Sequence, residues 1–259
     1  MIWALAACMD AQRIGSQRSA PQEVVEQEIV EQPLLNTQDL QVLARCGYVL
    51  VPEFLAVRMW KQIHGDLYQA VADLAAKTFH LACPPGTTDK EIASFIEDNL
   101  TAQALKEAVE VDGARICIAT VHQATPPWER TPGNENADGL AEGNIVAYTL
   151  VFPRAPQDVA DAAGDSTNTA LAYVSKCYAL PQFHGSGVAG ALMEYALEDA
   201  REAWGARQAS LGTNRANKRA TRFYRRLGFR KSGKRRFRVG DRWHDDFVFV
   251  RDLTPQSSE

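Results

Sequence analysis

The segment that most constrains this chain is a glycine-rich turn, PQFHGSGVAG, at residues 181–190. A strand-like run at 170–180 precedes it, and a helix-like run at 188–204 follows it. Gly185 and Gly187 allow a tight turn with no side chain between the backbone and a ligand. Because free N–H groups at a helix start point toward one spot, this order of elements predicts a phosphate or pyrophosphate site.

Two other phosphate-binding motifs do not fit the turn. A P-loop requires Gly-Lys-Ser/Thr after its first glycine, and none follows here. A dinucleotide fold would place the turn near the start of a βαβ unit, with an acidic residue about 20 positions later. Both readings are therefore excluded, although a glycine pair alone is a weak signal that also occurs in turns without ligands.

Helix-like and strand-like segments alternate from residue 53 onward, which predicts an α/β or α+β sheet with helices on its faces. We expect helices at 66–79 (capped by Asp66), 87–100, 101–109, 188–204 and 218–227. We expect strands at 47–51, 53–59, 115–121, 145–152, 170–180, 210–213, 231–239 and 247–251, the last two flanking a turn at 240–242. Polar segments at 124–143 and 154–168 predict an exposed insertion and a loop.

Composition places the chain among ordinary globular proteins. It has 259 residues, 46% hydrophobic and 23% charged, with a net charge of −4. This excludes a disordered or fibrous protein, and the acidic balance makes a nucleic-acid partner a weak expectation. Residues 1–52 are expected to form an N-terminal extension, flexible in part, and 53–259 a single folded domain.

Five scattered cysteines, with no C-x-x-C pair, argue against a disulfide framework or a zinc ribbon. A reducing cytoplasm is the expected location, and no metal is expected. The first eight residues end like a lipoprotein cleavage box, but they lack a basic leader and their apolar run is too short. Since no apolar run is long enough to span a bilayer, no membrane partner is expected.

Two motifs resemble the GNAT superfamily of N-acetyltransferases. Residues 178–181 ahead of 184–189 are similar to its acetyl-CoA signature, Q/R-x-x-G-x-G/A. Residues 217–229 are similar to its second signature, N-x-x-A-x-x-F-Y-x-x-x-G-F. The resemblance runs from about residue 53 to 253, and it implies a mixed, mostly antiparallel sheet of about seven strands flanked by helices.

The resemblance also implies acetyl-CoA as cosubstrate and a set of residues that bind it. One expected departure is that His184 stands where the motif has Gln or Arg, with the backbone donors still in place. The residues expected to bind the cofactor are Ala179, Leu180, His184, Gly185, Ser186, Gly187, Val188, Ala189, Asn217 and Lys218.

Within the superfamily, bacterial polyamine acetyltransferases of the spermidine/spermine type are the most similar group, on weaker signals. These signals are Thr78-Phe79, the helix 92–100 with Thr101, and Gly233, Phe237, Gly240 and Asp241 ahead of Asp246. They imply a small-molecule amine as acceptor. The oligomeric state stays open, with a homodimer as one option.

Acetylation of an amine sets three chemical requirements. An alkyl ammonium with a pKa near 10.4 must lose a proton, since only about one molecule in 10³ is uncharged at neutral pH. A free backbone N–H on the strand before Pro181 is suited to stabilise the oxyanion, as in the families this chain resembles. The departing thiolate needs a proton donor, and the resemblance assigns that role to Tyr224.

Several of these residues have an alternative role. Tyr224 could instead pack beside Phe223 and Phe229 with its hydroxyl in solvent, and Asn217 could cap a helix, contact the cofactor, or do both. The basic run at 214–242 is mostly a solvated face, with Lys218 and Arg219 expected to meet phosphates.

No general base is assigned. The acidic candidates are Asp89, Glu91, Glu97 and Asp98, and Tyr173 is a candidate for the acceptor pocket.

Three functions remain open at this point. The first is an acetyl-CoA-dependent N-acetyltransferase that acts on a small primary amine, or alternatively on a protein or peptide, by direct transfer in a ternary complex. The second is a GNAT fold that binds acyl-CoA as a sensor without turnover. The third is an iron-dependent dioxygenase with His64 and Asp66 as ligands, which leaves the glycine turn unexplained.

Overall fold

The computed structural model describes residues 56–61, 63–83, 86–123, 143–164, 170–239 and 242–254. The N-terminal extension, the strand expected at 47–51, nearly all of the 124–143 insertion and residues 240–241 of the last turn lie outside them.

Seven strands form one sheet, in the order β1-β2-β3-β4-β5-β7-β6. Every neighbouring pair is antiparallel except β4 and β5, which are parallel. The mixed, mostly antiparallel sheet is therefore confirmed. The strands are β1 (Ala56–Lys61), β2 (Arg115–Gln123), β3 (Ile145–Phe152), β4 (Leu171–Ala179), β5 (Gln208–Asn214), β6 (Arg230–Val239) and β7 (Arg242–Asp252).

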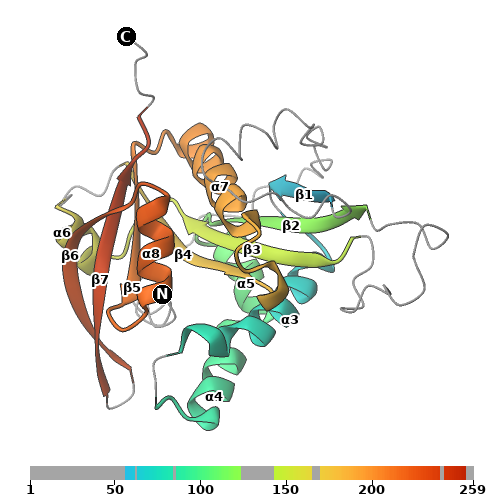
Figure 1. Ribbon diagram of the computed structural model, residues 1–259, viewed down its shortest axis with the longest axis horizontal. Coiled ribbons are helices and arrows are strands. Elements are labelled where there is room, and N and C mark those ends of the chain that lie inside the picture. Colours follow the sequence, from blue (N-terminus) through green and yellow to red (C-terminus); the bar gives the residue numbers. More distant parts are fainter. Residues whose placement is uncertain are drawn as a thin grey trace.

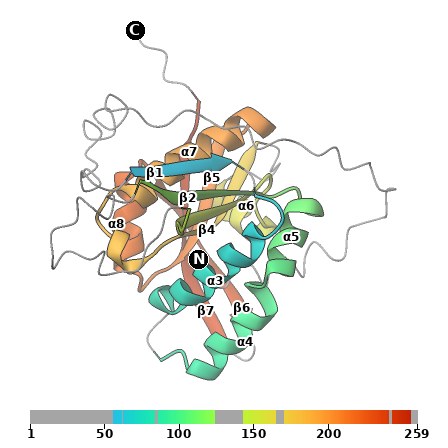
Figure 2. The same ribbon diagram turned by 90° about the vertical axis from the view of Figure 1, so that its right-hand side faces the viewer.

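Helices cover both faces of this sheet, as Figures 1 and 2 show. One core lies under α7 and α8, and the other lies under α3 to α6. In the described ranges no helix is both long and apolar enough to cross a membrane. The helices are α3 (Leu67–Phe79), α4 (Asp89–Asn99), α5 (Ala102–Glu110), α6 (Gln157–Ala163), α7 (Val188–Trp204) and α8 (Lys218–Arg226), with short 3-10 turns at His80–Ala82 and Pro181–Phe183.

Two helix starts follow directly from side-chain capping. Thr88 accepts a hydrogen bond from the Glu91 N–H, and the Glu91 carboxylate accepts one from the Thr88 N–H, which is a complete capping box. Thr101 caps α5 by accepting from the Ala104 N–H. Asp66 occupies the N-cap position of α3, but its side chain makes no capping hydrogen bond, so the cap predicted there is wrong.

The structure also corrects two segments. The loop predicted at 154–168 contains α6, because Val159 and Ala160 bury an apolar contact on the sheet that its polar composition hides. The last strand begins at Arg242, not at Phe247, so Arg242 belongs to β7 and not to a turn.

The sheet opens at its centre. β4 and β5 pair only over Leu171–Tyr173 and Gln208–Ser210, and beyond these positions both strands continue without pairing to each other. On its other edge β4 carries a bulge, because Lys176 opposes Leu150 whereas Val174 opposes Val151, which leaves Ser175 as an extra residue. The bulge puts Tyr173, Lys176 and Tyr178 on the same face of the sheet.

Candidate active site

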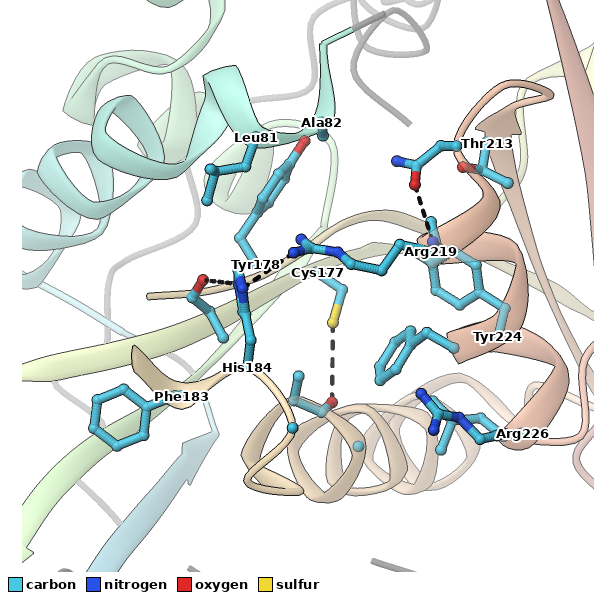
Figure 3. A pocket seen from close by; sticks show the side chains of 18 of the residues that line it. Leu81, Ala82, Cys177, Tyr178, Phe183, His184, Thr213, Arg219, Tyr224 and Arg226 are labelled. Atoms are coloured by element: carbon cyan, nitrogen blue, oxygen red, sulfur yellow. Dashed lines mark hydrogen bonds between the residues drawn. The ribbon is translucent and has the colours of Figure 1, made fainter. Parts of the chain in front are cut away.

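A cavity of about 470 Å³ lies where β4 and β5 separate. The glycine turn, the start of α7 and the inner side of α8 form its walls, and β4 forms its floor (Figure 3). Its volume falls within the range of about 300–1,000 Å³ that is common for small-molecule sites. Among the described residues its lining includes Arg219 and Arg226 but no carboxylate, so it suits an anionic ligand.

The glycine turn has the backbone geometry of an anion site. Gly185 and Gly187 have φ values of 86° and 89°, which a residue with a side chain rarely adopts. The Ser186 hydroxyl accepts from the Val188 N–H at 3.3 Å, so that donor is already used. The N–H groups of Gly185, Gly187, Ala189 and Gly190 have no partner among the described residues, and all four residues line the cavity. They are the donors that remain for an anion.

His184 and Arg219 connect the turn to α8. Arg219 Nη1 lies 3.1 Å from His184 Nδ1, and His184 Nε2 lies 3.1 Å from the Ala179 carbonyl oxygen. Because a guanidinium only donates, Nδ1 must accept, and the imidazole is neutral with its proton on Nε2. Burial, and then the charge of Arg219, lower the pKa of His184 and favour this neutral form.

The departure predicted at His184 is wrong. The first residue of Q/R-x-x-G-x-G stands three positions before the first glycine, which is Gln182 in this chain. His184 therefore occupies a variable position of the motif, and its contact with Arg219 is a property of this chain and not of the motif.

The open edge of β4 directs backbone groups into the gap. The Leu180 N–H donates to the Val146 carbonyl at 2.9 Å, which points it toward β3. Since backbone groups alternate along a strand, those of Cys177 and Ala179 point toward β5, which offers no pairing partner there. An N–H in this position can donate to an oxyanion.

Tyr224 lies in the cavity wall with only 1% of its surface exposed. Its ring packs edge-on against Phe223 and Phe229, at centroid distances of 5.2 and 5.9 Å. Tyr224 therefore packs against Phe223 and Phe229, as the alternative role predicted. Its side chain is buried at the cavity, however, and its hydroxyl does not lie in solvent. Burial raises the pKa of Tyr224 well above 10, so the hydroxyl keeps its proton at physiological pH.

The structure brings together seven of the predicted residues and leaves four outside the cavity lining. Leu180 and Val188 use their N–H groups inside the protein, Ser186 supports the turn, and Lys218 is exposed. The residues that line the cavity are Ala179, His184, Gly185, Gly187, Ala189, Asn217 and Tyr224. Asn217 also caps α8 by accepting from the Ala220 N–H at 2.9 Å.

Sequence reasoning missed two lining residues on β4, Cys177 and Tyr178. The alternation of a strand, counted back from Ala179, could have placed Cys177 beside the glycine turn. Tyr178 faces the opposite side and forms the cavity end beside Leu81 and Ala82.

The other chemical candidates lie outside the cavity lining. Asp89, Glu97 and Asp98 are exposed on α4, and Glu91 is used in its capping box. Tyr173, on β4, is fully buried.

The iron ligands proposed for a dioxygenase are not part of the cavity either. His64 and Asp66 are exposed at the start of α3. In the part of the chain that the structure describes, no group of three or more His, Cys, Asp or Glu side chains is placed to hold a metal.

Comparisons with known proteins agree with this geometry. Residues 101–229 match the model of the acetyltransferase (GNAT) family. The chain is 36% identical over 183 residues to an uncharacterized N-acetyltransferase of Mycobacterium bovis and to one of Mycobacterium tuberculosis, covering 71% of this chain and 96% of each relative.

Among solved structures, the PaiA N-acetyltransferase of Thermoplasma acidophilum in complex with coenzyme A matches the fold. Its TM-score is 0.51 at 12% identity, and the match covers 76% of this chain and 99% of that protein.

Proposed function

The chain belongs to the acetyltransferase (GNAT) family, and we propose that it transfers an acetyl group from acetyl-CoA to a small primary amine within a ternary complex. The observation that carries the proposal is one cavity that joins an anion site to a proton donor. Arg219 and the N–H groups of Ala189 and Gly190 lie at one part of it, and Tyr224 lies at another.

The residues present fit CoA. Two arginines and the glycine turn suit its phosphates, because guanidinium groups and helix N-termini both bind phosphate oxygens. The gap between β4 and β5 suits an extended arm, since the open edge of β4 offers backbone donors and acceptors along its length. Asn217 is placed to contact the cofactor while it caps α8.

Three groups of this chain then serve the transfer. The backbone N–H of Cys177 or Ala179 donates to the thioester oxygen as negative charge develops on it. The amine nitrogen forms a bond to the carbonyl carbon, and the carbon–sulfur bond breaks. Tyr224, which stays protonated, donates to the departing thiolate.

For the acceptor we propose a polyamine as the first candidate, on the similarity of residues 78–101 and 233–246 to polyamine acetyltransferases. A cytoplasmic location is consistent with the free thiols of Cys83, Cys117 and Cys177. Both statements refine the proposal, and transfer to another small amine would leave the rest of it intact.

An acceptor screen tests the proposal. Purified protein is incubated with acetyl-CoA and a panel of polyamines, amino acids, aminoglycosides and peptide N-termini, and thiol release is followed. Turnover with a small amine is expected. Acetyl-CoA binding without thiol release for any acceptor would favour the sensor, and turnover confined to peptides would favour a protein or peptide acetyltransferase.

A further inference from the structure

We propose that Lys176 is the group that takes the proton from the acceptor amine, through the hydroxyl of Tyr178 and a bridging water. The inference rests on the proposed acetyl transfer and supplies the proton acceptor that none of the exposed carboxylates of α4 provides. It depends on the face of β4 on which Lys176 lies, on its surroundings and on two hydroxyls of the same face.

Lys176 lies on the acceptor side of β4. It shares a face with Tyr178, two residues further on, and the extra residue at Ser175 puts Tyr173 on that face as well. Tyr178 lines the cavity beside Leu81 and Ala82, on the face opposite to the glycine turn. Cofactor and acceptor thus approach the same strand from its two faces.

Lys176 is buried, and no carboxylate of the described residues pairs with it. Its exposed surface is 1%, and its ammonium lies over the Phe95 ring, 5.6 Å from Nζ to the centroid. No ion pair or hydrogen bond of Nζ is found within the described ranges. Burial alone lowers the pKa of Lys176 to about 7, so most of it is neutral at slightly alkaline pH.

The neighbouring titratable groups do not compete for the proton. Tyr148 from β3, Tyr178 from β4 and Cys83 after α3 all face this region, and burial raises the pKa of each. Tyr173, on the same face, lies near the charge of Arg235. Tyr148, Tyr178 and Cys83 therefore stay neutral while Lys176 titrates, which leaves the amine of Lys176 as the base.

Two hydroxyls on the same face of the sheet as Lys176 have no hydrogen-bond partner among the described residues. The hydroxyls of Tyr148 and Tyr178 are buried and have no hydrogen-bond partner in the described chain, and the two rings stack at 5.8 Å. A buried hydroxyl without a partner is uncommon in a folded protein and indicates that a ligand or water completes it. The Tyr178 hydroxyl makes no hydrogen bond to Lys176 itself, so a water that bridges the two groups is part of the proposed path. Tyr178 can then accept a proton from the acceptor ammonium and pass its own through this water to Lys176 without ionising.

The step balances within the proposed reaction. The acceptor ammonium loses one proton to Tyr178, whose phenolic proton moves through the bridging water to the neutral Lys176 nitrogen. The free amine then attacks the thioester, and Tyr224 protonates the departing thiolate. The second amine proton is released to solvent as the amide forms, and Tyr224 regains a proton from solvent, so the net proton of the reaction is the one on Lys176. Lys176 returns its proton to solvent before the next turnover. Burial of the acceptor ammonium lowers its pKa, which brings that pKa closer to the pKa of Lys176.

The test compares Lys176→Met, which keeps the length of the side chain, with Lys77→Met, which alters an exposed lysine of α3. With spermidine, or the panel amine that gives turnover, Lys176→Met should lower kcat at neutral pH at least about 10²-fold, with the KM for acetyl-CoA within twofold. The wild-type rate should level off above about pH 8, whereas the Lys176→Met rate should keep rising about tenfold per pH unit. Tyr178→Phe should share the loss.

Each outcome separates the two proposals. A Lys176→Met enzyme with the rate and pH profile of the wild type overturns the role of Lys176 and leaves acetyl transfer standing. A wild type that turns over no amine overturns both. A measurement independent of any variant is NMR titration of wild-type protein with labelled lysine side chains: one lysine should titrate near pH 7, and ordinary values for all of them would refute the inference.

Discussion

Replacement of Lys176 by Met should stabilise the protein while it removes activity, and the gain should depend on pH. Burial lowers the pKa of Lys176 from 10.5 to about 7, which costs the folded state about 5 kcal/mol at 1.36 kcal/mol per pH unit. Met keeps the apolar stem and its packing near Phe95 but has no charge to desolvate. Replacing a buried charge by an apolar side chain of similar volume is often stabilising.

The sign of the pH dependence follows from proton binding. Between about pH 7 and 10.5 the unfolded chain holds a proton on Lys176 that the folded protein has lost. Wild-type stability therefore rises with pH across this window, by at most about 1.4 kcal/mol per pH unit from this group. Below pH 7 both states are protonated and the full cost applies, so the advantage of the Met variant is largest there.

Guanidinium unfolding of both proteins at several values from about pH 6 to 9 measures the difference. It should be largest near pH 6 and fall as pH rises, whereas Lys77→Met should show no comparable trend, because Lys77 is exposed. A difference that does not change with pH would refute the reasoning. So would a Lys176→Met variant that is less stable than the wild type at pH 6, since the ammonium would then have a stabilising partner.

Three further changes test other parts of the site and fold. Tyr224→Phe should lower kcat by about 10²–10⁴-fold with little change in acetyl-CoA affinity, and Tyr68→Phe, a buried tyrosine of α3, should leave kcat unchanged in steady-state kinetics. Arg219→Gln should weaken acetyl-CoA binding by about 10- to 100-fold in calorimetry with a smaller effect on kcat, as expected for one charged hydrogen-bond donor. Gly233→Ala should lower the free energy of unfolding by about 1–3 kcal/mol, seen as a lower Tm in thermal unfolding, because a Cβ there would lie 2.4 Å from the Ala162 carbonyl oxygen.

Local signals in the sequence predicted most of the fold. The turn at Gly185 and Gly187, the start of the helix expected at 87–100 and the cap at Asn217 depend on residues a few positions apart, so a single segment carries the information. α6 was missed because its short apolar contact forms only against a distant part of the sheet. Its burial is a tertiary effect that polar composition conceals.

The face on which Tyr173 lies could not be predicted, and the reason is one residue of register. Alternation counted back from Ala179 puts Lys176 and Tyr178 on the face opposite to Cys177, but it also puts Tyr173 on the same face as Cys177. The extra residue at Ser175 reverses that parity, and only the pairing with β3 reveals it. The bulge also lets Cys177 and Ala179 face the glycine turn while Tyr173 packs on the other core. Because of the bulge, Cys177 lies on the cofactor face of β4, whereas Tyr173 joins Lys176 and Tyr178 on the acceptor face.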